Sequence, residues 1–325
     1  MLNAAVIGCG AIGEKRAKAL DGLVTIDSCN DIDTTRSNAF AAKFSCKKVD
    51  TLEEVLDNNK INLVFIATTH ELLADIALQC LNSGKHVFIE KPGAINFFEL
   101  EKVRQAAKEK NLIVHIGYNH RYHPAIRQAI TMFTAGDIGK LLFLRARYGH
   151  GGRLGYEKEW RGKKNLSGGG ELIDQGTHLL DLSIAFLGDI SLEYGATPNY
   201  FWDMEVEDNV FISIKNKVGS IAFLHASCTE WKNTFSLEVY GETGKIEVSG
   251  LGGSYGIERL NHYKMLPEMG PPETTSWEFL VDDSWHLEVK EFIEDVVGES
   301  SNSSNIDTSV RVLELVDEIY ERTGR

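Results

Sequence analysis

Hydrophobic positions in the first 120 residues form short apolar runs separated by amphipathic stretches. The apolar runs are typical of buried strands, and the stretches between them carry the 3.6-residue period of helices. Strands are predicted at residues 4–7, 24–29, 63–67, 86–90 and 113–117, and helices at 13–20, 35–44, 52–56, 71–82 and 98–110. Because strands that alternate with helices build right-handed βαβ units, the pattern predicts an α/β fold with a doubly wound parallel sheet.

The pattern changes after Pro124, where strand-like runs follow one another with turns between them. Strands are predicted at 140–148, 209–214, 220–228, 234–240 and 245–249, and helices at 125–135, 171–187, 285–297 and 309–323. Turns at 216–217 and 242–244 fit hairpins, so this half is predicted to be α+β with a mainly antiparallel open sheet. The Ser/Asn tract at 300–305 is predicted to be a short exposed connection.

Composition narrows the class of protein. Of the 325 residues, 43% are hydrophobic and 25% are charged, as in globular proteins, and at roughly 150 residues per domain the length predicts two domains. With 34 Lys and Arg against 47 Asp and Glu, the formal net charge is −13. A dedicated nucleic-acid or anionic-membrane binder needs a basic face, so the balance argues against both classes but leaves small anionic substrates open.

Cysteine usage and the N-terminal residues predict a compartment. The five cysteines are scattered and form no C-x-x-C pair, so we expect buried free thiols in a reducing cytoplasm. The first residues show neither the basic region nor the cleavage site of a secretory signal. No apolar run approaches the ~20 residues of a membrane span.

A glycine pattern, G-x-G-x-x-G, occupies residues 8–13, directly after a predicted strand and at the start of a predicted helix. In this context Gly8 permits the tight turn, Gly10 lets the backbone approach a pyrophosphate, and Gly13 allows close packing of helix and strand. The helix N-terminus offers N–H groups to phosphates. The pattern therefore predicts a dinucleotide site, the alternative being a glycine-rich turn without a ligand.

Asp31 lies at the end of the second predicted strand, 18 residues beyond Gly13. An acid at this place accepts hydrogen bonds from the ribose hydroxyls of NAD and repels the 2′-phosphate of NADP. Arg36 is close enough in sequence to stack on adenine or engage a phosphate, so NADP is not excluded. The alternative for Asp31 is a solvated residue at a strand end.

Three further motifs follow in order: GKHVFIEKP at 84–92, GYNHRYHPA at 117–125 and GGGELIDQGTH at 168–178. Together with the glycine pattern they resemble the glucose–fructose oxidoreductase/inositol dehydrogenase/MocA family of NAD(P)-dependent enzymes over nearly the whole chain. The resemblance implies a dinucleotide-binding Rossmann domain, predicted at 1–120, and an α+β domain for substrate binding and oligomerisation, predicted at 121–325. It also implies a homodimer or homotetramer. One departure is Ala-Thr-Thr-His at 67–70, where members often carry Ala-Thr-Pro-Asn.

The resemblance assigns Lys91, Asp174 and His178 to the family's catalytic set. Asp174 and His178 are four residues apart on one predicted helix and so share a face, and an imidazole exchanges protons near neutral pH. Lys91 follows a strand at the edge where open parallel sheets bind ligands. The alternative for the Asp/His pair is an ordinary surface pair. A metal site is a further alternative because His120 and His123 lie in the neighbouring motif, but no compact metal-ligand set is present, so no metal is predicted.

The stretch 148–161 gathers cations and aromatics in a glycine-bearing loop, as in a lid or substrate collar. Guanidinium groups suit carboxylates or phosphates and aromatic faces suit sugars, so we expect a polyol substrate with an anionic part. The alternative is a solvated loop or a subunit contact. The predicted substrate-binding residues are Lys91, Tyr118, Arg121, Tyr148, Arg153, Trp160, Arg161, Asp174 and His178.

The chain is thus predicted to be an NAD-dependent dehydrogenase acting on a secondary hydroxyl of a sugar, sugar acid, nucleotide sugar or cyclitol. Two rivals stay open, a glycosidase that retains its NAD and a non-catalytic sensor or scaffold that binds the cofactor. The predicted cofactor-binding residues are Gly8, Gly10, Ala11, Ile12, Gly13, Asp31, Arg36, Thr68, Glu90 and Lys91.

Overall fold

The computed structural model describes residues 2–298 and 304–325. Contacts within the chain group it into two compact units. The first unit is Met1–Tyr118 with Trp285–Arg311, and the second is Asn119–Ser284 with Val312–Arg325. The predicted domain division at residues 120 and 121 stays a prediction. Among the described residues, no helix combines the length and the hydropathy that crossing a membrane requires.

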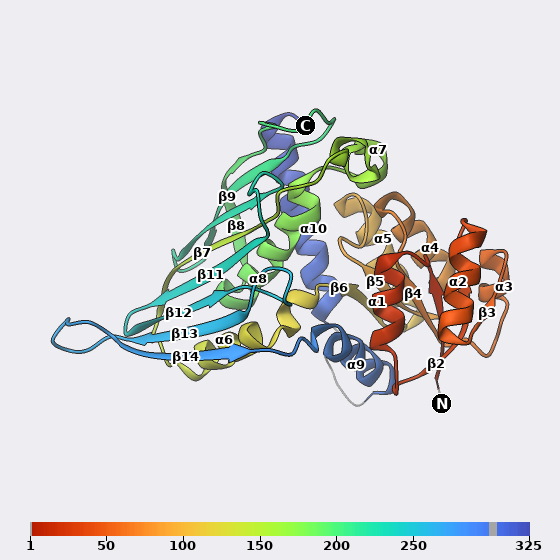
Figure 1. Cartoon of the computed structure of the whole chain (residues 1–325), viewed down its shortest axis with the longest axis horizontal. Helices are drawn as coiled ribbons and strands as arrows, with labels where there is room; N and C mark the ends of the chain where they lie inside the picture. Colours follow the sequence, from red (N-terminus) through yellow and green to blue (C-terminus); the bar gives the residue numbers. More distant parts are fainter. Residues whose placement is uncertain (1, 299–303) are drawn as a thin grey trace. The chain divides into compact units, whose positions relative to one another are not determined.

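The first unit contains a six-stranded parallel sheet in the order β3-β2-β1-β4-β5-β6 (Figure 1). Its strands are β1 (Asn3–Ile7), β2 (Thr25–Asn30), β3 (Lys47–Lys48), β4 (Leu63–Ile66), β5 (His86–Glu90) and β6 (Val114–Gly117). Its helices up to Tyr118 are α1 (Ala11–Ala19), α2 (Thr34–Phe44), α3 (Leu52–Leu56), α4 (His70–Asn82) and α5 (Phe97–Lys110). The predicted α/β fold is confirmed. The strand order reverses between β1 and β4, the point at which such sheets bind ligands.

A segment far along the chain completes the core of the first unit. In helix α9 (Ser284–Val297), Val289 and Phe292 are fully buried in one cluster with Phe65 and Phe88. The Phe292 ring meets the Phe65 ring edge-on, with centroids 5.7 Å apart. Burial of one aromatic side chain contributes about 2–3 kcal/mol, so α9 is an integral part of this unit.

The second unit contains an eight-stranded sheet in the order β14-β13-β12-β11-β7-β10-β9-β8. The strands are β7 (Leu141–Gly149), β8 (Ile190–Ala196), β9 (Asn209–Asn216), β10 (Ile221–Ser227), β11 (Thr234–Gly241), β12 (Gly244–Ser249), β13 (Glu258–Lys264) and β14 (Glu273–Phe279). All neighbours are antiparallel except β7 and β10, which are parallel, so the mainly antiparallel prediction is confirmed. The helices α6 (Pro124–Ala135) and α8 (Thr177–Leu187), and α10 (Ser304–Thr323) from Val312 onward, lie along one face of this sheet (Figure 1).

Alternation along the strands gives this sheet one buried and one exposed face. In β10, Leu224 and Ala226 are buried, whereas Phe223 between Ala222 and Leu224 is 57% exposed. The same period in the sequence supported the prediction of these strands.

Three segments differ from the predictions. The predicted helix at 171–187 begins with a π-helical segment, Leu172–Gly176, and only then becomes α8. The predicted loop at 148–161 contains short helical turns at Tyr156–Lys158 and Trp160–Gly162, and a further turn follows at Lys164–Ser167. The helix predicted from residue 309 begins at Ser304, while residues 300–303 of the Ser/Asn tract lie outside the described residues.

Candidate active site

The turn between β1 and α1 is built by close backbone approach. Gly8 has a φ of +93°, and a Cβ there would lie 2.4 Å from the Ala67 carbonyl oxygen. A Cβ on Gly13 would lie 1.9 Å from the Gly8 carbonyl oxygen. These two glycines therefore serve the turn itself, since any side chain would collide with backbone.

Gly10 has a different reason to be glycine. No described protein atom lies within 4 Å of the position that its Cβ would take. Gly10 is the N-cap of α1 and has no side chain with which to cap the helix, so the N–H groups of Ala11, Ile12 and Gly13 form the end that an anion would meet. Open space in front of a helix N-terminus fits the pyrophosphate of a dinucleotide.

Asp31, directly after β2, is held by backbone donors. One carboxylate oxygen accepts the Cys9 N–H at 2.7 Å and the other accepts the Asp33 N–H at 2.8 Å. The first bond joins Asp31 to the glycine turn. Arg36 is exposed and its Nε lies 3.2 Å from Asp33 Oδ2, so its predicted cofactor contact stays a prediction.

The ends of β4, β5 and β6 carry the other predicted residues of the first unit. Thr68 and Lys91 follow β4 and β5 and are half-buried, and Tyr118 follows β6 with 1% of its surface exposed. Because neighbouring parallel strands end at the same edge, Thr68 and Lys91 lie at the carboxyl edge of the sheet.

Glu90, predicted to bind cofactor, takes part in a buried ion-pair network. Its carboxylate accepts the Arg16 Nε–H, and Arg16 Nη1 donates to Glu288 at 2.5 Å. The guanidinium also lies over the rings of Phe88 and Trp285, at 4.4 and 4.2 Å from their centroids. Glu90 therefore ties α1 to β5 next to Lys91, and a cofactor contact by Glu90 stays a prediction.

In the second unit, Asp174 and His178 are 6% and 4% exposed. The His178 ring stacks on His120 with centroids 3.8 Å apart and an interplanar angle of 16°. Tyr148 meets both imidazoles edge-on, at 4.7 Å from His120 and 5.8 Å from His178. Asp174 lies in the π-helical segment and His178 in the first turn of α8. Such π segments occur frequently at functional sites.

Arg161 is the cation that the structure brings to this cluster. Its Nε lies 3.2 Å from Asp174 Oδ2, and its guanidinium lies over the Trp160 ring at 4.5 Å. Burial opposes the charge of Arg161, but Asp174, together with Tyr156 and Glu159, outweighs that effect and raises the pKa of Arg161. Tyr148, Trp160, Arg161, Asp174 and His178 thus form one group among the predicted substrate-binding residues.

Two other predicted substrate ligands have different partners. Arg121 donates to the Asp181 carboxylate at 2.7 Å and to its carbonyl oxygen at 2.9 Å. Arg153 is exposed and forms two hydrogen bonds with Glu159, at 2.7 and 2.5 Å. The roles of Arg121 and Arg153 toward substrate stay predictions.

The three glycines before the π-helical segment explain how it is held. A Cβ on Gly169 would lie 1.9 Å from Tyr320 Oη, and a Cβ on Gly170 would lie 2.0 Å from the Glu207 carbonyl oxygen. The Glu171 N–H donates to that same carbonyl oxygen at 3.1 Å. Close packing of backbone on backbone therefore fixes where the segment with Asp174 begins.

Sequence reasoning considered His120 only as a possible metal ligand and assigned no role to Glu171, although both residues lie inside the motifs at 117–125 and 168–178. Glu171 is 1% exposed and accepts the Tyr156 hydroxyl at 3.2 Å. Burial, with a further effect from the Asp174 charge, raises the pKa of Glu171 to about 8. The sequence did contain a sign of this: Glu171 lies between three glycines and the apolar pair Leu172 and Ile173, a position that predicts burial.

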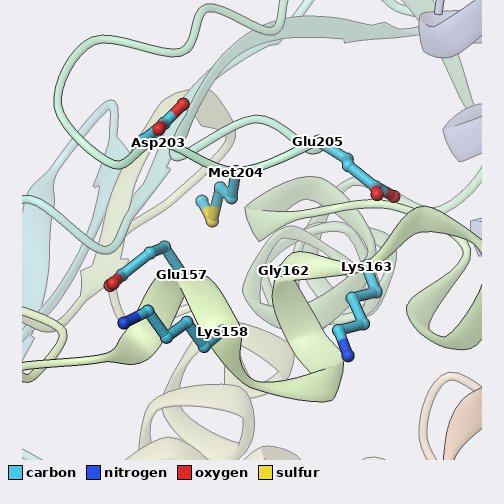
Figure 2. Close-up of a pocket in the computed structure, with 7 residues that line it drawn as sticks. All are labelled: Glu157, Lys158, Gly162, Lys163, Asp203, Met204 and Glu205. Carbon is cyan, nitrogen blue, oxygen red and sulfur yellow. The ribbon is translucent and has the colours of Figure 1, made fainter.

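A surface pocket of about 520 Å³ also lies in the second unit (Figure 2). Its lining contains Glu157, Lys158, Gly162, Lys163, Asp203, Met204 and Glu205. The Glu205 carboxylate accepts the Lys164 N–H at 3.1 Å, so this acid braces the loop. Within the described residues, no group of three or more His, Cys, Asp and Glu side chains could hold a metal ion.

Comparison with known proteins adds to this geometry. Residues 2–118 match the model of the oxidoreductase family with an NAD-binding Rossmann fold, and residues 126–247 match the GFO/IDH/MocA C-terminal domain. The chain belongs to the Gfo/Idh/MocA family. The resemblance noted in the sequence motifs is thereby confirmed, and so is the predicted NAD cofactor, since this family's N-terminal domain is NAD-binding.

Characterised Gfo/Idh/MocA relatives are distant and match part of the chain. Levoglucosan dehydrogenase from Pseudarthrobacter phenanthrenivorans is 32% identical over 139 residues, which is 42% of this chain and 36% of that enzyme. Inositol 2-dehydrogenase from Salmonella typhimurium is 29% identical over 154 residues, 45% of this chain and 46% of that enzyme. The chain thus spans less than half of the length of these relatives.

Solved structures agree with the family's fold over the full length. Levoglucosan dehydrogenase in complex with NADH and L-sorbose has a TM-score of 0.89 at 20% identity, covering 100% of this chain and 97% of that one. GenD2 from gentamicin A biosynthesis in complex with NAD has a TM-score of 0.86 at 23% identity, covering 100% and 95%.

Proposed function

We propose that the protein catalyses hydride transfer between a nicotinamide dinucleotide and a secondary hydroxyl or ketone group. The substrate is a sugar, sugar acid, nucleotide sugar or cyclitol. The observation that carries the proposal is the pair of buried side chains His178 and Asp174 with half-buried Arg161 beside Asp174, in a chain whose other unit has the turn of an NAD-binding domain.

His178 is the proposed acid and base for the hydroxyl proton. A neutral imidazole accepts this proton and the imidazolium returns it in the reverse direction. Stacking on His120 fixes the plane of the His178 ring, and Tyr148 packs against the ring edges. When bound, NAD supplies the carbon that accepts or returns the hydride.

Asp174 and Lys91 are proposed to orient the reacting oxygen. The Asp174 carboxylate faces the Arg161 guanidinium at 3.2 Å, and an ammonium such as that of Lys91 stabilises a developing alkoxide. Among relatives, levoglucosan dehydrogenase and inositol 2-dehydrogenase act on substrates of the proposed kind, as their names state, which supports a polyol substrate.

Arg161 favours a substrate with an anionic part. Its side chain is 31% exposed while its Nε faces Asp174, so the rest of its planar fork suits a carboxylate or phosphate. We propose NAD as the preferred cofactor because Asp31 carries a negative charge beside the glycine turn.

The test is an NAD⁺-reduction screen of inositols, free sugars, uronic acids and nucleotide sugars, repeated with His178→Ala. We expect wild type to form NADH with at least one class and His178→Ala to lose at least 100-fold in kcat while binding NAD normally. Equal turnover by the two proteins would remove His178 from the mechanism. Product release from a glycoside without net NADH would instead identify the NAD-retaining glycosidase.

A further inference from the structure

Glu171 is a buried acid that the mechanism above does not use. It stands at the start of the π-helical segment that contains Asp174, and 1% of its surface is exposed. A buried carboxyl group must either be neutral or receive enough donors to hold its charge. The donors around it therefore decide which form is present.

The two neighbouring acids have the donors that an anion needs. Asp174 faces the Arg161 guanidinium at 3.2 Å. Glu207 accepts the N–H groups of Gly170 and Leu172 at 3.1 and 3.0 Å and the Tyr320 hydroxyl at 2.8 Å. Each of these carboxylates therefore has stronger donors than a single hydroxyl, although burial still raises the pKa of Glu207.

Glu171 is equipped differently. Its Oε1 accepts the Tyr156 hydroxyl at 3.2 Å, and His150 Nε2 lies 3.7 Å away, beyond hydrogen-bond distance. His150 Nδ1 accepts the Gly152 N–H at 3.0 Å, so a neutral His150 carries its proton on Nε2. The Cys228 thiol is a further, weak donor, and Glu171 Oε2 is buried without a hydrogen-bond partner among the described residues. One hydroxyl, one thiol and an imidazole beyond hydrogen-bond distance are weak support for a buried anion next to Asp174.

Groups from several elements face Glu171 and influence its pKa. Those that carry or exchange charge are Asp174, Glu207, His150, Tyr148, Tyr156, Cys228 and Tyr255, with Arg161 reached through Asp174. Burial and the negative charges of Asp174 and Glu207 favour the neutral form of Glu171, and they outweigh the opposing hydrogen bonds from Cys228 and Tyr156.

We propose that Glu171 is a positioning residue that works as a neutral, proton-bearing acid, and that loss of its proton switches the site off at alkaline pH. When Glu171 is neutral, it does not compete with Asp174 for the Arg161 guanidinium. An ionised Glu171 competes for that guanidinium and adds negative charge where the substrate alkoxide develops, which raises the barrier. The kinetic part of this proposal rests on the proposed function.

The first experiment needs no substrate. Infrared difference spectra between wild type and Glu171→Gln, recorded from pH 5 to pH 10, report the C=O band of a protonated carboxyl group. We expect a band that is present at pH 7 in wild type only and disappears at alkaline pH. Its absence at pH 7 would overturn the proposal, whatever reaction the protein catalyses.

The second experiment measures kcat against pH with the substrate found in the screen. The kcat of wild type should fall about tenfold per pH unit on the alkaline side of the profile. Glu171→Gln, a neutral isostere, should stay within about twofold of wild type at pH 7 and lack this decrease. Glu157→Gln, a change at the surface pocket of Figure 2 on the same loop, is the matched control and should keep the wild-type profile.

Tyr156→Phe provides an independent variant. Its hydroxyl stabilises the ionised carboxylate of Glu171, so its removal should move the alkaline decrease of kcat to higher pH. An alkaline decrease of kcat that persists in Glu171→Gln contradicts the proposal. So does a kcat of Glu171→Gln more than tenfold below wild type at pH 7, if this variant melts at the wild-type temperature. If the screen finds no substrate, the infrared titration still decides the protonation state.

Discussion

Arg153 and Arg161 belong to one loop, and a sequence cannot tell their roles apart. Both lie among aromatics and glycines, yet Arg153 is 63% exposed and paired with Glu159, whereas Arg161 faces buried Asp174. The difference arises from long-range packing of the loop on the π-helical segment. Exposed pairs contribute about 0–1 kcal/mol, while a buried carboxylate without its cation is strongly destabilised.

These two arginines give the first prediction. Arg161→Ala should raise KM for an anionic sugar at least tenfold and lower kcat, because Asp174 loses its partner. Arg153→Ala, the matched control, should change both constants less than about twofold. Steady-state kinetics with an anionic and a neutral sugar measure this, and equal losses on both substrates would exclude an anion-binding role for Arg161.

Cofactor preference depends on Asp31. Asp31→Asn keeps an oxygen that accepts the Cys9 N–H but removes the negative charge, so the ratio of NAD to NADP affinity should fall at least about tenfold, or roughly 1.4 kcal/mol. Fluorescence titration with NADH and NADPH measures the ratio. Asp33→Asn keeps a cap for α2 and should leave the ratio unchanged. An unchanged ratio in Asp31→Asn would contradict the assignment.

Glu171 also predicts how stability depends on pH. In the unfolded chain this carboxyl group ionises near pH 4.5, but in the native protein its pKa is about 8 because of burial and the Asp174 charge. Between these values the native state binds more protons than the unfolded state, so native stability falls as pH rises.

Glu171→Gln removes this effect. Its melting temperature relative to wild type should rise from about pH 4.5 to about pH 8 and then stay constant. Scanning calorimetry across this range measures the difference. A difference that is independent of pH would mean that Glu171 does not keep its proton in the folded protein.

At the scale of elements, hydrophobic period and capping residues predicted most helices and strands of the first unit. Strand β4 was predicted at 63–67 and spans Leu63–Ile66, and the helix predicted at 98–110 spans Phe97–Lys110. The π-helical turn at Leu172–Gly176 was not predicted, because it depends on backbone contacts of Gly169 and Gly170 with distant residues. Periodicity reports which face is buried, not how tightly the backbone is wound.

The β1–α1 turn yields a prediction that separates folding from binding. Gly13→Ala places a methyl group 1.9 Å from the Gly8 carbonyl oxygen and should destabilise the protein by about 3 kcal/mol or more. Gly10→Ala meets no described protein atom within 4 Å and should melt like wild type but bind NAD at least about tenfold more weakly.

Thermal melting and calorimetric titration with NAD measure these two effects. Normal NAD binding by Gly10→Ala would show that the cofactor does not approach this turn. Normal melting of Gly13→Ala would show that the turn relaxes at low cost.

At the scale of the whole molecule, the sequence predicted two structural halves but not that α9 belongs with the first. Its apolar period showed a helix, and nothing in a local pattern identifies the partner of an apolar face. The partners are Phe65 and Phe88, more than 200 residues earlier, and a buried hydrogen bond of 2.7 Å joins His115 to Asp295. Likewise, His120 and His178 meet only because the fold brings two motifs together.

Phe292→Ala tests this distant contribution. The side chain is fully buried against aromatic rings, so the change should cost about 3–5 kcal/mol of unfolding free energy. It should also weaken NAD binding, because α9 packs on the sheet that carries the glycine turn. Val297→Ala, at a half-exposed position of the same helix, should have little effect on urea denaturation.

The contact of Tyr320 with Glu207 and Gly169 has a consequence for synthesis on the ribosome. The strands of the second unit and the motif at 168–178 are complete long before residue 320 emerges. The Tyr320 hydroxyl donates to Glu207, beside the π-helical turn, only after α10 has packed against the rest of the second unit. A nascent chain halted before Tyr320 would therefore hold most of its sheet but lack the hydroxyl that braces this turn, so that the geometry on which the proposed function depends is completed among the last steps of folding.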